Sequence, residues 1–142
     1  MASNPPAQPG PAIGRPELVA TALSVAAEAK GQPYTWGGHT TDGFDCSGFV
    51  VYSLKQAYPS GGWTYMTAHQ LFISRRFEAV TGPPRPGDLI GWRQGGIVTH
   101  DHVGIVISDT HWIGSQSTGG VRPVKLSDPY WSSRHPFFLR LK

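Results

Sequence analysis

Apolar residues near the start of the chain recur at helical spacing and predict a first helix. The helix begins near Pro16, since proline is tolerated in a first turn, and it ends at Gly31. One face of this helix is apolar and consists of Leu18, Ala22, Val25, Ala26 and Ala29. Residues 1–14 precede it, rich in proline and small polar residues, and we expect them to form a flexible lead-in.

A second apolar stretch predicts another helix, which starts at Asp45 or Cys46. Asp is a residue type that caps helix N-termini. The helix carries Phe49, Val50, Tyr52, Ser53 and Leu54. Residues 32–43, between the two helices, are rich in Gly and Thr and are expected to be turn-like. The glycines at 61–62 break the chain, and a short third helix is expected at about 67–75.

After residue 86 the pattern changes to short runs of β-branched and aromatic residues, which predict strands. The expected strands are Asp88–Trp92, His102–Ser108, His111–Gln116, Val121–Val124 and Phe137–Arg140. Turn signals at 108–110 and 119–120 separate them. Helices followed by a meander of strands indicate an α+β fold. A chain of 142 residues suits one domain, which we place at residues 15–142.

The chain carries few charges and is mildly basic. Charged residues make up 15% of the sequence, and the net charge is +3. Lys and Arg are scattered, which argues against a nucleic-acid partner, whereas the basic balance favours adhesion to an anionic polymer. No apolar run approaches the ~18 residues of a membrane span. We expect a monomer that uses no cofactor and no metal.

The one cysteine, Cys46, lies in a stretch with glycines on both sides, residues 43–50. Thiols react as thiolates, and a helix N-terminus lowers the pKa of a thiol through its unpaired amides and its macrodipole. The same amides can hold the oxyanion of an acyl-transfer transition state. An isolated cysteine is more often a small buried hydrophobe, but the residues around Cys46 favour a nucleophile.

A nucleophilic thiol needs a base, and the sequence offers six histidines. His102 begins the apolar stretch 103–107, which would fix its ring if that stretch is a buried strand. His100 lies two residues earlier and therefore on the same strand face, so the residues alone do not separate the two. Ordinary surface or core positions are the interpretation for His39, His69, His111 and His135.

Two long motifs resemble one protein family. Residues 34–38 (Tyr-Thr-Trp-Gly-Gly) and 43–50 (Gly-Phe-Asp-Cys-Ser-Gly-Phe-Val) are similar to the nucleophile region of the NlpC-type cell-wall cysteine peptidases. Residues 86–90 and 102–105 are similar to the histidine region of that family, and Tyr130-Trp131 resembles its C-terminal signature. The resemblance implies a papain-like α+β fold, with N-terminal helices packed on a short antiparallel sheet and the nucleophile at a helix N-terminus.

The resemblance also implies an activity: a peptidoglycan hydrolase that cleaves a stem-peptide amide bond next to D-glutamate and a diamino acid. By residue, it implies that Cys46 is the nucleophile and His102 the general base. Tyr34 matches a residue that helps to bind substrate or the oxyanion, and a core aromatic is the alternative. Asp45 and Ser47 flank the nucleophile, where helix capping and contact with substrate or the oxyanion are both open.

A third polar residue, which orients the imidazole in the family, lacks a clear counterpart. Alignment of the strand and hairpin puts Gly114 at its position, and glycine has no side chain for that role. Gln116 shares the strand face by alternation, whereas Ser115 and His111 would need a bulge or a shifted hairpin. The alternative is a dyad in which water or a backbone carbonyl orients the base.

Other functions on the same residues stay open. Residues 63–67 differ from the family pattern, and Trp63 and Tyr65 form either part of a substrate wall or a cover for the core. An amidase or acyltransferase would use the same Cys and His on another carbonyl. An inactive cell-wall binding module is suggested by Gly114 alone.

We expect action at the bacterial cell wall or in the periplasm, although residues 1–6 lack the basic and apolar regions of a secretory signal. Three routes are compatible with this: injection as an antibacterial toxin by a specialised secretion machine, phage lysis, or origin in a larger exported protein. The first implies a cognate immunity protein in the producing cell.

Overall fold

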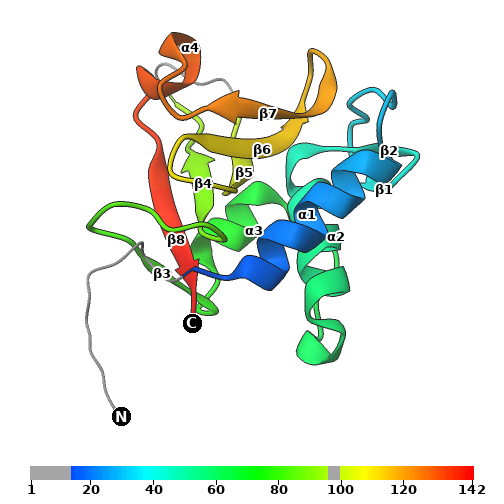
Figure 1. The fold of residues 1–142 in the computed structure, drawn as a ribbon, viewed down its shortest axis with the longest axis horizontal. Coiled ribbons are helices and arrows are strands. Elements are labelled where there is room, and N and C mark those ends of the chain that lie inside the picture. Colours follow the sequence, from blue (N-terminus) through cyan, green and yellow to red (C-terminus); the bar gives the residue numbers. More distant parts are fainter. Residues whose placement is uncertain (1–13, 96–99) are drawn as a thin grey trace.

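The computed structural model describes residues 14–95 and 100–142. Within them, the first three helices pack on one face of an antiparallel sheet, and the last short helix lies against the other face (Figure 1). The helices are α1 (Pro16–Glu28), α2 (Cys46–Ala57), α3 (Ala68–Ile73) and α4 (Pro129–Ser132), with a single 3-10 turn, η1, at Pro59–Gly61. The α+β class is therefore confirmed. The order of helices before strands holds only in part, because a short hairpin lies between α1 and α2, and α4 precedes the last strand.

The main sheet has six strands in the order β3-β8-β4-β5-β6-β7. The strands are β3 (Phe77–Ala79), β4 (Leu89–Trp92), β5 (His102–Val106), β6 (His111–Gln116), β7 (Gly120–Lys125) and β8 (Phe137–Leu141). Every neighbouring pair is antiparallel. Gly119 and Gly120, with φ of 88° and 67°, make the tight turn that joins β6 to β7, because left-handed backbone favours glycine.

A small hairpin leads the chain into α2. Its strands are β1 (His39–Thr40) and β2 (Gly43–Phe44). The first turn of α2 packs directly on the backbone before this hairpin: a Cβ at Gly48 would lie 2.0 Å from the carbonyl oxygen of Gly38. Glycine at residue 48 is therefore required for this approach, which fixes where the helix N-terminus sits.

Two apolar clusters lie on opposite faces of the sheet. The larger one fills the space between the helices and the sheet and includes Leu18, Phe49, Leu71, Val103 and Ile105. The smaller one is formed by Ile90, Trp92, Val106, Trp112 and Val124, with Trp131 of α4 packed against it. By strand alternation His102 belongs to the face of this second cluster.

The five expected strands are found, each within two residues of its expected bounds. Helix α3 is shorter than expected, because a capping box of Thr67 and Gln70 starts it and Ser74 leaves helical geometry. Strands β1, β2 and β3 and helix α4 were not expected from the sequence; each is at most four residues long. Of the proposed lead-in, residues 1–13 lie outside the described residues, and the boundaries of the domain stay a prediction.

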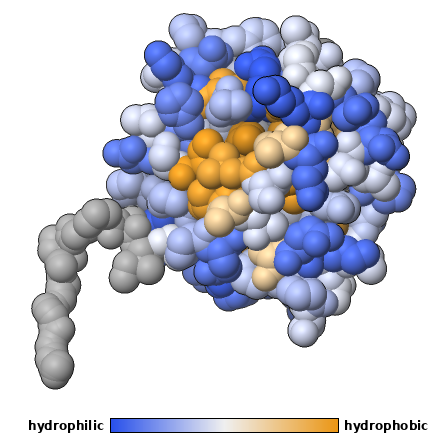
Figure 2. Space-filling view, turned by 45° about the vertical axis from the view of Figure 1, so that its right-hand side comes forward, coloured by the Kyte–Doolittle hydropathy of each residue, from blue (hydrophilic) through white to orange (hydrophobic). Residues whose placement is uncertain are grey.

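The outer side of α1 is not fully polar. Leu23 is 46% exposed, and on the face turned forward in Figure 2 apolar residues form one patch bordered by hydrophilic ones. Among the described residues, no helix has the length and apolar character that crossing a bilayer requires.

Candidate active site

Cys46 is the first residue of α2, and the residue before it caps that helix. The Asp45 carboxylate accepts a hydrogen bond from the backbone N–H of Gly48 (2.5 Å), one of the donors that a helix N-terminus leaves unpaired. The backbone N–H groups of Cys46, Ser47 and Val103 interact with the sulfur and favour its ionised form. The thiol thus lies where amides from a helix and a strand converge.

The Asp45 carboxylate also links α2 to a second segment. Its Oδ2 accepts a hydrogen bond from the Tyr65 hydroxyl (2.5 Å), and its Oδ1 accepts one from the Ser47 hydroxyl (3.2 Å). Asp45 and Ser47 are both buried, and the bond from Gly48 shows that Asp45 caps the helix. Contact of either residue with substrate stays a prediction.

The resting thiol is not ionised. Burial, and then the negative charge of Asp45, raise the pKa of Cys46 to about 11 and outweigh the backbone amides. The helix amides do lower this pKa, as expected, but burial has the larger effect and the net shift is upward. The thiol donates its hydrogen bond to the carbonyl oxygen of Asp101 (3.8 Å), next to His102 in sequence.

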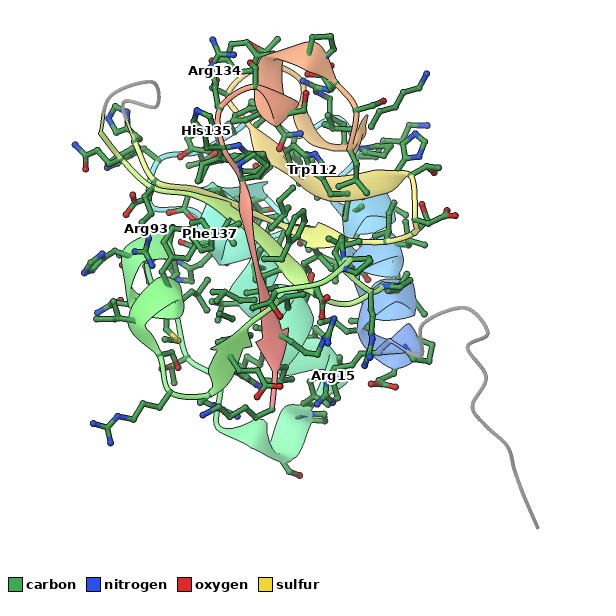
Figure 3. The ribbon with its side chains drawn as sticks, turned by 90° about the vertical axis from the view of Figure 1, so that its left-hand side faces the viewer. Arg15, Arg93, Trp112, Arg134, His135 and Phe137 are labelled. Atoms are coloured by element: carbon green, nitrogen blue, oxygen red, sulfur yellow. The ribbon has the colours of Figure 1, made fainter. Side chains whose placement is uncertain are left out.

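His102 opens β5 and lies among tryptophans. Its imidazole stacks on Trp131, with 4.7 Å between ring centroids and 16° between planes. Trp92 and Trp112 lie 5.7 and 5.9 Å away. Trp131 is itself fixed, because its carbonyl accepts a hydrogen bond from Trp92 Nε1 (3.0 Å). In Figure 3 the labels of Trp112 and Arg134 show where this tryptophan cluster lies, in the upper part of the view.

This apolar surrounding makes His102 a weak base at rest. Burial lowers the pKa of His102 to about 4, and the Gln116 side chain opposes part of that shift. Among the described residues, His102 Nε2 and Gln116 Oε1 are both buried without a hydrogen-bond partner. Trp112 Nε1 is likewise buried without a partner, so the Gln116 oxygen has two candidate donors; its effect on the pKa of His102 favours the imidazole.

The strand register explains why Gln116 is near His102. Strand β5 pairs with β6 through Ile105 and Ile113, and the same register carried toward the start of β5 brings Gln116 opposite His102. A Cβ at Gly114 would lie 3.1 Å from Gln116 Oε1. The Gln116 amide therefore occupies the space beside Gly114, where the family's third residue was expected.

The other two candidates for the third position are engaged elsewhere. Ser115 points to the opposite sheet face and donates a hydrogen bond to the carbonyl oxygen of Phe44 (2.8 Å). His111 lies at the far end of β6, where its Nδ1 hydrogen-bonds the Thr110 hydroxyl (2.8 Å). Of the three alternatives, the structure brings only Gln116 to His102.

One cavity of about 690 Å³ connects these groups, and Tyr34, Cys46, His102, Gln116 and Trp131 all line it. Burial, followed by electrostatic repulsion from Cys46 when it is ionised and from Asp45, raises the pKa of Tyr34 to about 12. The Tyr34 phenol therefore stays protonated and can donate a hydrogen bond inside the cavity.

The histidine that sequence could not separate from His102 occupies a different environment. His100 also lines the cavity, but its ring contacts Trp36 edge-on at 5.8 Å. Trp36 is 79% exposed, so this pair lies at the solvent side of the site. His102, by contrast, lies against the buried tryptophan cluster.

The two aromatic residues of segment 63–67 have different roles. Tyr65 lines the cavity and bonds Asp45, as a substrate wall would require. Trp63 is buried and packs on Phe77 as part of the core. Sequence reasoning missed the contact of Trp131 with His102; the only available signal was its place in the C-terminal signature.

A buried thiol at a helix N-terminus, with a histidine on the first residue of a neighbouring strand, in a domain of helices on an antiparallel sheet, defines a papain-like architecture. The model of the NlpC/P60 family matches residues 31–140. The chain belongs to the NlpC/P60 family.

Curated relatives are named as endopeptidases. The chain is 35% identical over 108 residues to the murein DD-endopeptidase MepH of Escherichia coli strain K12, covering 74% of this chain and 39% of that protein. It is 35% identical over 104 residues to the probable endopeptidase YafL of the same strain, covering 71% of this chain and 41% of that protein. The chain thus spans about two fifths of the length of these relatives.

Solved structures share the fold. The NlpC/P60 domain of the peptidoglycan hydrolase SagA is 28% identical with a TM-score of 0.58, over 87% of this chain and 98% of that one. An NlpC/P60 family protein from Bacillus cereus is 26% identical with a TM-score of 0.67, over 86% of this chain and 39% of that one.

Proposed function

We propose that the protein is a cysteine peptidase that hydrolyses an amide bond in peptidoglycan stem peptides, with Cys46 as nucleophile and His102 as general base. One observation carries the proposal: the thiol at the N-terminus of α2 and the imidazole of β5 line the same cavity. Membership of the family and the names of its endopeptidase members support the substrate class. Action at the cell wall or in the periplasm follows from that substrate.

The proposed reaction begins from a neutral pair. As the thiol sulfur attacks the carbonyl carbon, His102 accepts the thiol proton, and the amides around the sulfur with the Tyr34 hydroxyl stabilise the oxyanion. The imidazolium then protonates the leaving amine, and a thioester on Cys46 remains. Water, deprotonated by His102, hydrolyses the thioester and releases the acid.

Gln116 is proposed to orient the base. Its Oε1 lies buried without a partner near the equally unpartnered Nε2 of His102, and its amide raises the pKa of His102. Nε2–H donation to this oxygen would leave Nδ1 free to receive the Cys46 proton. The amide is neutral, so it stabilises an imidazolium less than a carboxylate would.

The test is digestion of purified peptidoglycan by the wild type and single variants, with products identified by mass. Cys46→Ala should abolish product release and keep the fold, because the side chain changes little in volume. His102→Ala should lower the rate about 10²–10⁴-fold, the usual contribution of a general base. His100→Ala is the matched control and should cost far less. Release of products by Cys46→Ala at the wild-type rate would refute the assignment of Cys46 as nucleophile.

The masses of the same products also show which amide bond of peptidoglycan is cleaved. Cleavage next to D-glutamate and a diamino acid is our proposal. Release at the lactyl amide would make the enzyme an amidase, and transfer to an added amine would make it an acyltransferase.

A second candidate function is a binding module without activity, which is suggested by Gly114 at the position expected for the third catalytic residue. In that case the wild type would bind peptidoglycan and release no product.

A further inference from the structure

A second cavity, of about 410 Å³, lies outside the candidate active site. Arg15, Arg75, Arg76 and Lys142 line it together with the indole of Trp63. We call this hollow the cation pocket. Arg15 appears at one end of the molecule in Figure 3 and Arg134, which lines the active-site cavity, at the other. Strand β8 runs between the two ends.

The positive charge of the cation pocket is only partly balanced within the protein, because Arg15 is close enough to Glu17 to help lower the pKa of that carboxyl. Lys142 and the three arginines are accompanied by no acidic residue in the lining. All nine Asp and Glu residues belong to the described ranges. Within those ranges, the one salt bridge joins Arg140 to Asp88 and involves no residue of the pocket. The guanidinium groups of Arg75 and Arg76 therefore keep their N–H donors available to a ligand.

Two of the cations are held in place. The Arg76 guanidinium lies 3.5 Å over the ring of Trp63, which is only 4% exposed and so forms a firm base. Arg15 donates hydrogen bonds to the carbonyl oxygens of Leu141 (2.9 Å) and Lys142 (3.2 Å). The pocket thus presents partly preorganised donors, which reduces the entropy cost of binding.

We propose that the cation pocket binds phosphate groups, either as the free ion or repeated along an anionic polymer such as a wall polyphosphodiester. One bidentate arginine satisfies a carboxylate, whereas several cations that line one hollow, with no acidic side chain in the lining, suit the charge and the oxygens of phosphate. Because the pocket lies away from the active-site end, an enzyme held there on a polymer keeps its cleft free. The proposal does not depend on catalysis.

The test compares two double variants with the same net charge. Arg75→Ala/Arg76→Ala removes two pocket cations, whereas Lys30→Ala/Lys125→Ala removes two exposed cations elsewhere on the surface. Affinity for poly(glycerol phosphate) is measured by titration calorimetry over a range of NaCl concentrations. We expect the pocket variant to lose about tenfold or more and to show a weaker salt dependence. The control variant should stay within about twofold.

Further arms identify the ligand. Displacement of the polymer by millimolar inorganic phosphate would assign the free ion as sufficient, and its failure would assign the polymer. Equal binding of poly(glutamate) would overturn the phosphate class. Equal loss in the two double variants would overturn the pocket itself.

Loss of Arg76 could disturb the fold by uncovering Trp63. Arg75→Ala/Lys142→Ala keeps that stacking and should weaken binding as well. Hydrolysis of a soluble peptide substrate should be unchanged in every pocket variant. Binding that is intact in a wild type without hydrolytic activity would refute the proposed function and leave the phosphate site standing.

Discussion

The imidazole of His102 takes its character from residues distant in the sequence. Trp131 stacks on it, and Trp92 and Trp112 lie beside it, although 39 residues separate Trp92 from Trp131. Alternation could place His100 and His102 on one strand face but could not reveal this cluster. The thiol is similar: its place at a helix start was predictable, but the burial that dominates its pKa was not.

Removal of the Gln116 amide should weaken the base. Gln116→Ala is expected to lower kcat about tenfold, roughly the 1.4 kcal/mol of one neutral hydrogen bond. Because the amide raises the pKa of His102, the acid limb of the kcat/KM profile should also move to lower pH. His111→Ala is the control on the same strand and should change neither quantity. A Gln116→Ala enzyme with wild-type kcat and pH profile would contradict the assignment.

The buried His102 should also contribute to acid sensitivity of the fold. Its native pKa of about 4 lies below the ordinary 6.5, so between these values the unfolded chain binds more protons. The free energy of unfolding should therefore fall as pH drops through this window. We expect a loss of about 2 kcal/mol, less than the full pKa shift implies, because part of the ring faces the cavity. In His102→Gln, urea unfolding at pH 7 and pH 4 should differ less than in wild type, by about that amount. An equal pH dependence in both proteins would contradict the buried imidazole.

At the scale of elements, the N-terminus of α2 combines a cap with a charge. Asp45 accepts hydrogen bonds from Gly48 and Tyr65, and its charge raises the pKa of Cys46. Asp45→Ala should destabilise the domain by about 1–2 kcal/mol through loss of the cap. Asp45→Asn should keep most of that stability and still lower the pKa of Cys46, because it removes the charge.

Thermal unfolding and the pH dependence of thiol alkylation measure these two effects. Asp42→Asn removes an exposed charge three residues earlier and serves as the control. If Asp45→Asn left the alkylation profile in place, the cap and the thiol would be electrostatically independent.

The longer elements were predictable because their own residues carry the periodicity. Helix α1 buries Leu18, Ala22 and Val25 at helical spacing, and β5 follows a run of apolar residues. Strand β3 was missed because its three residues pair with β8, about 60 positions later in the chain. Such short elements are stabilised by a partner rather than by their own pattern.

At the scale of the molecule, the class of the fold followed from element order but the arrangement of strands did not. The last strand, β8, inserts between β3 and β4, and no local signal indicates this. The insertion aligns Arg140 with Asp88, whose carboxylate it binds at 2.9 and 3.0 Å. It also places α4, which comes just before β8 in the chain, beside the tryptophan cluster, which is why the contact of Trp131 with His102 was missed.

The bonds from Arg15 to the carbonyl oxygens of Leu141 and Lys142 also mean that the start of α1 and the end of β8 emerge at one edge of the domain (Figure 1). Such a domain is a candidate for circular permutation. A circular permutant that joins residue 142 to residue 15 through about five glycine and serine residues, and opens at Asp109 in the exposed β5–β6 turn, should fold with a Tm within a few degrees of wild type. A permutant opened between Gly104 and Ile105, inside β5, should fail to fold. If both permutants failed to fold, the free ends would themselves be needed for stability. The domain would then not tolerate fusion to a longer chain at either end.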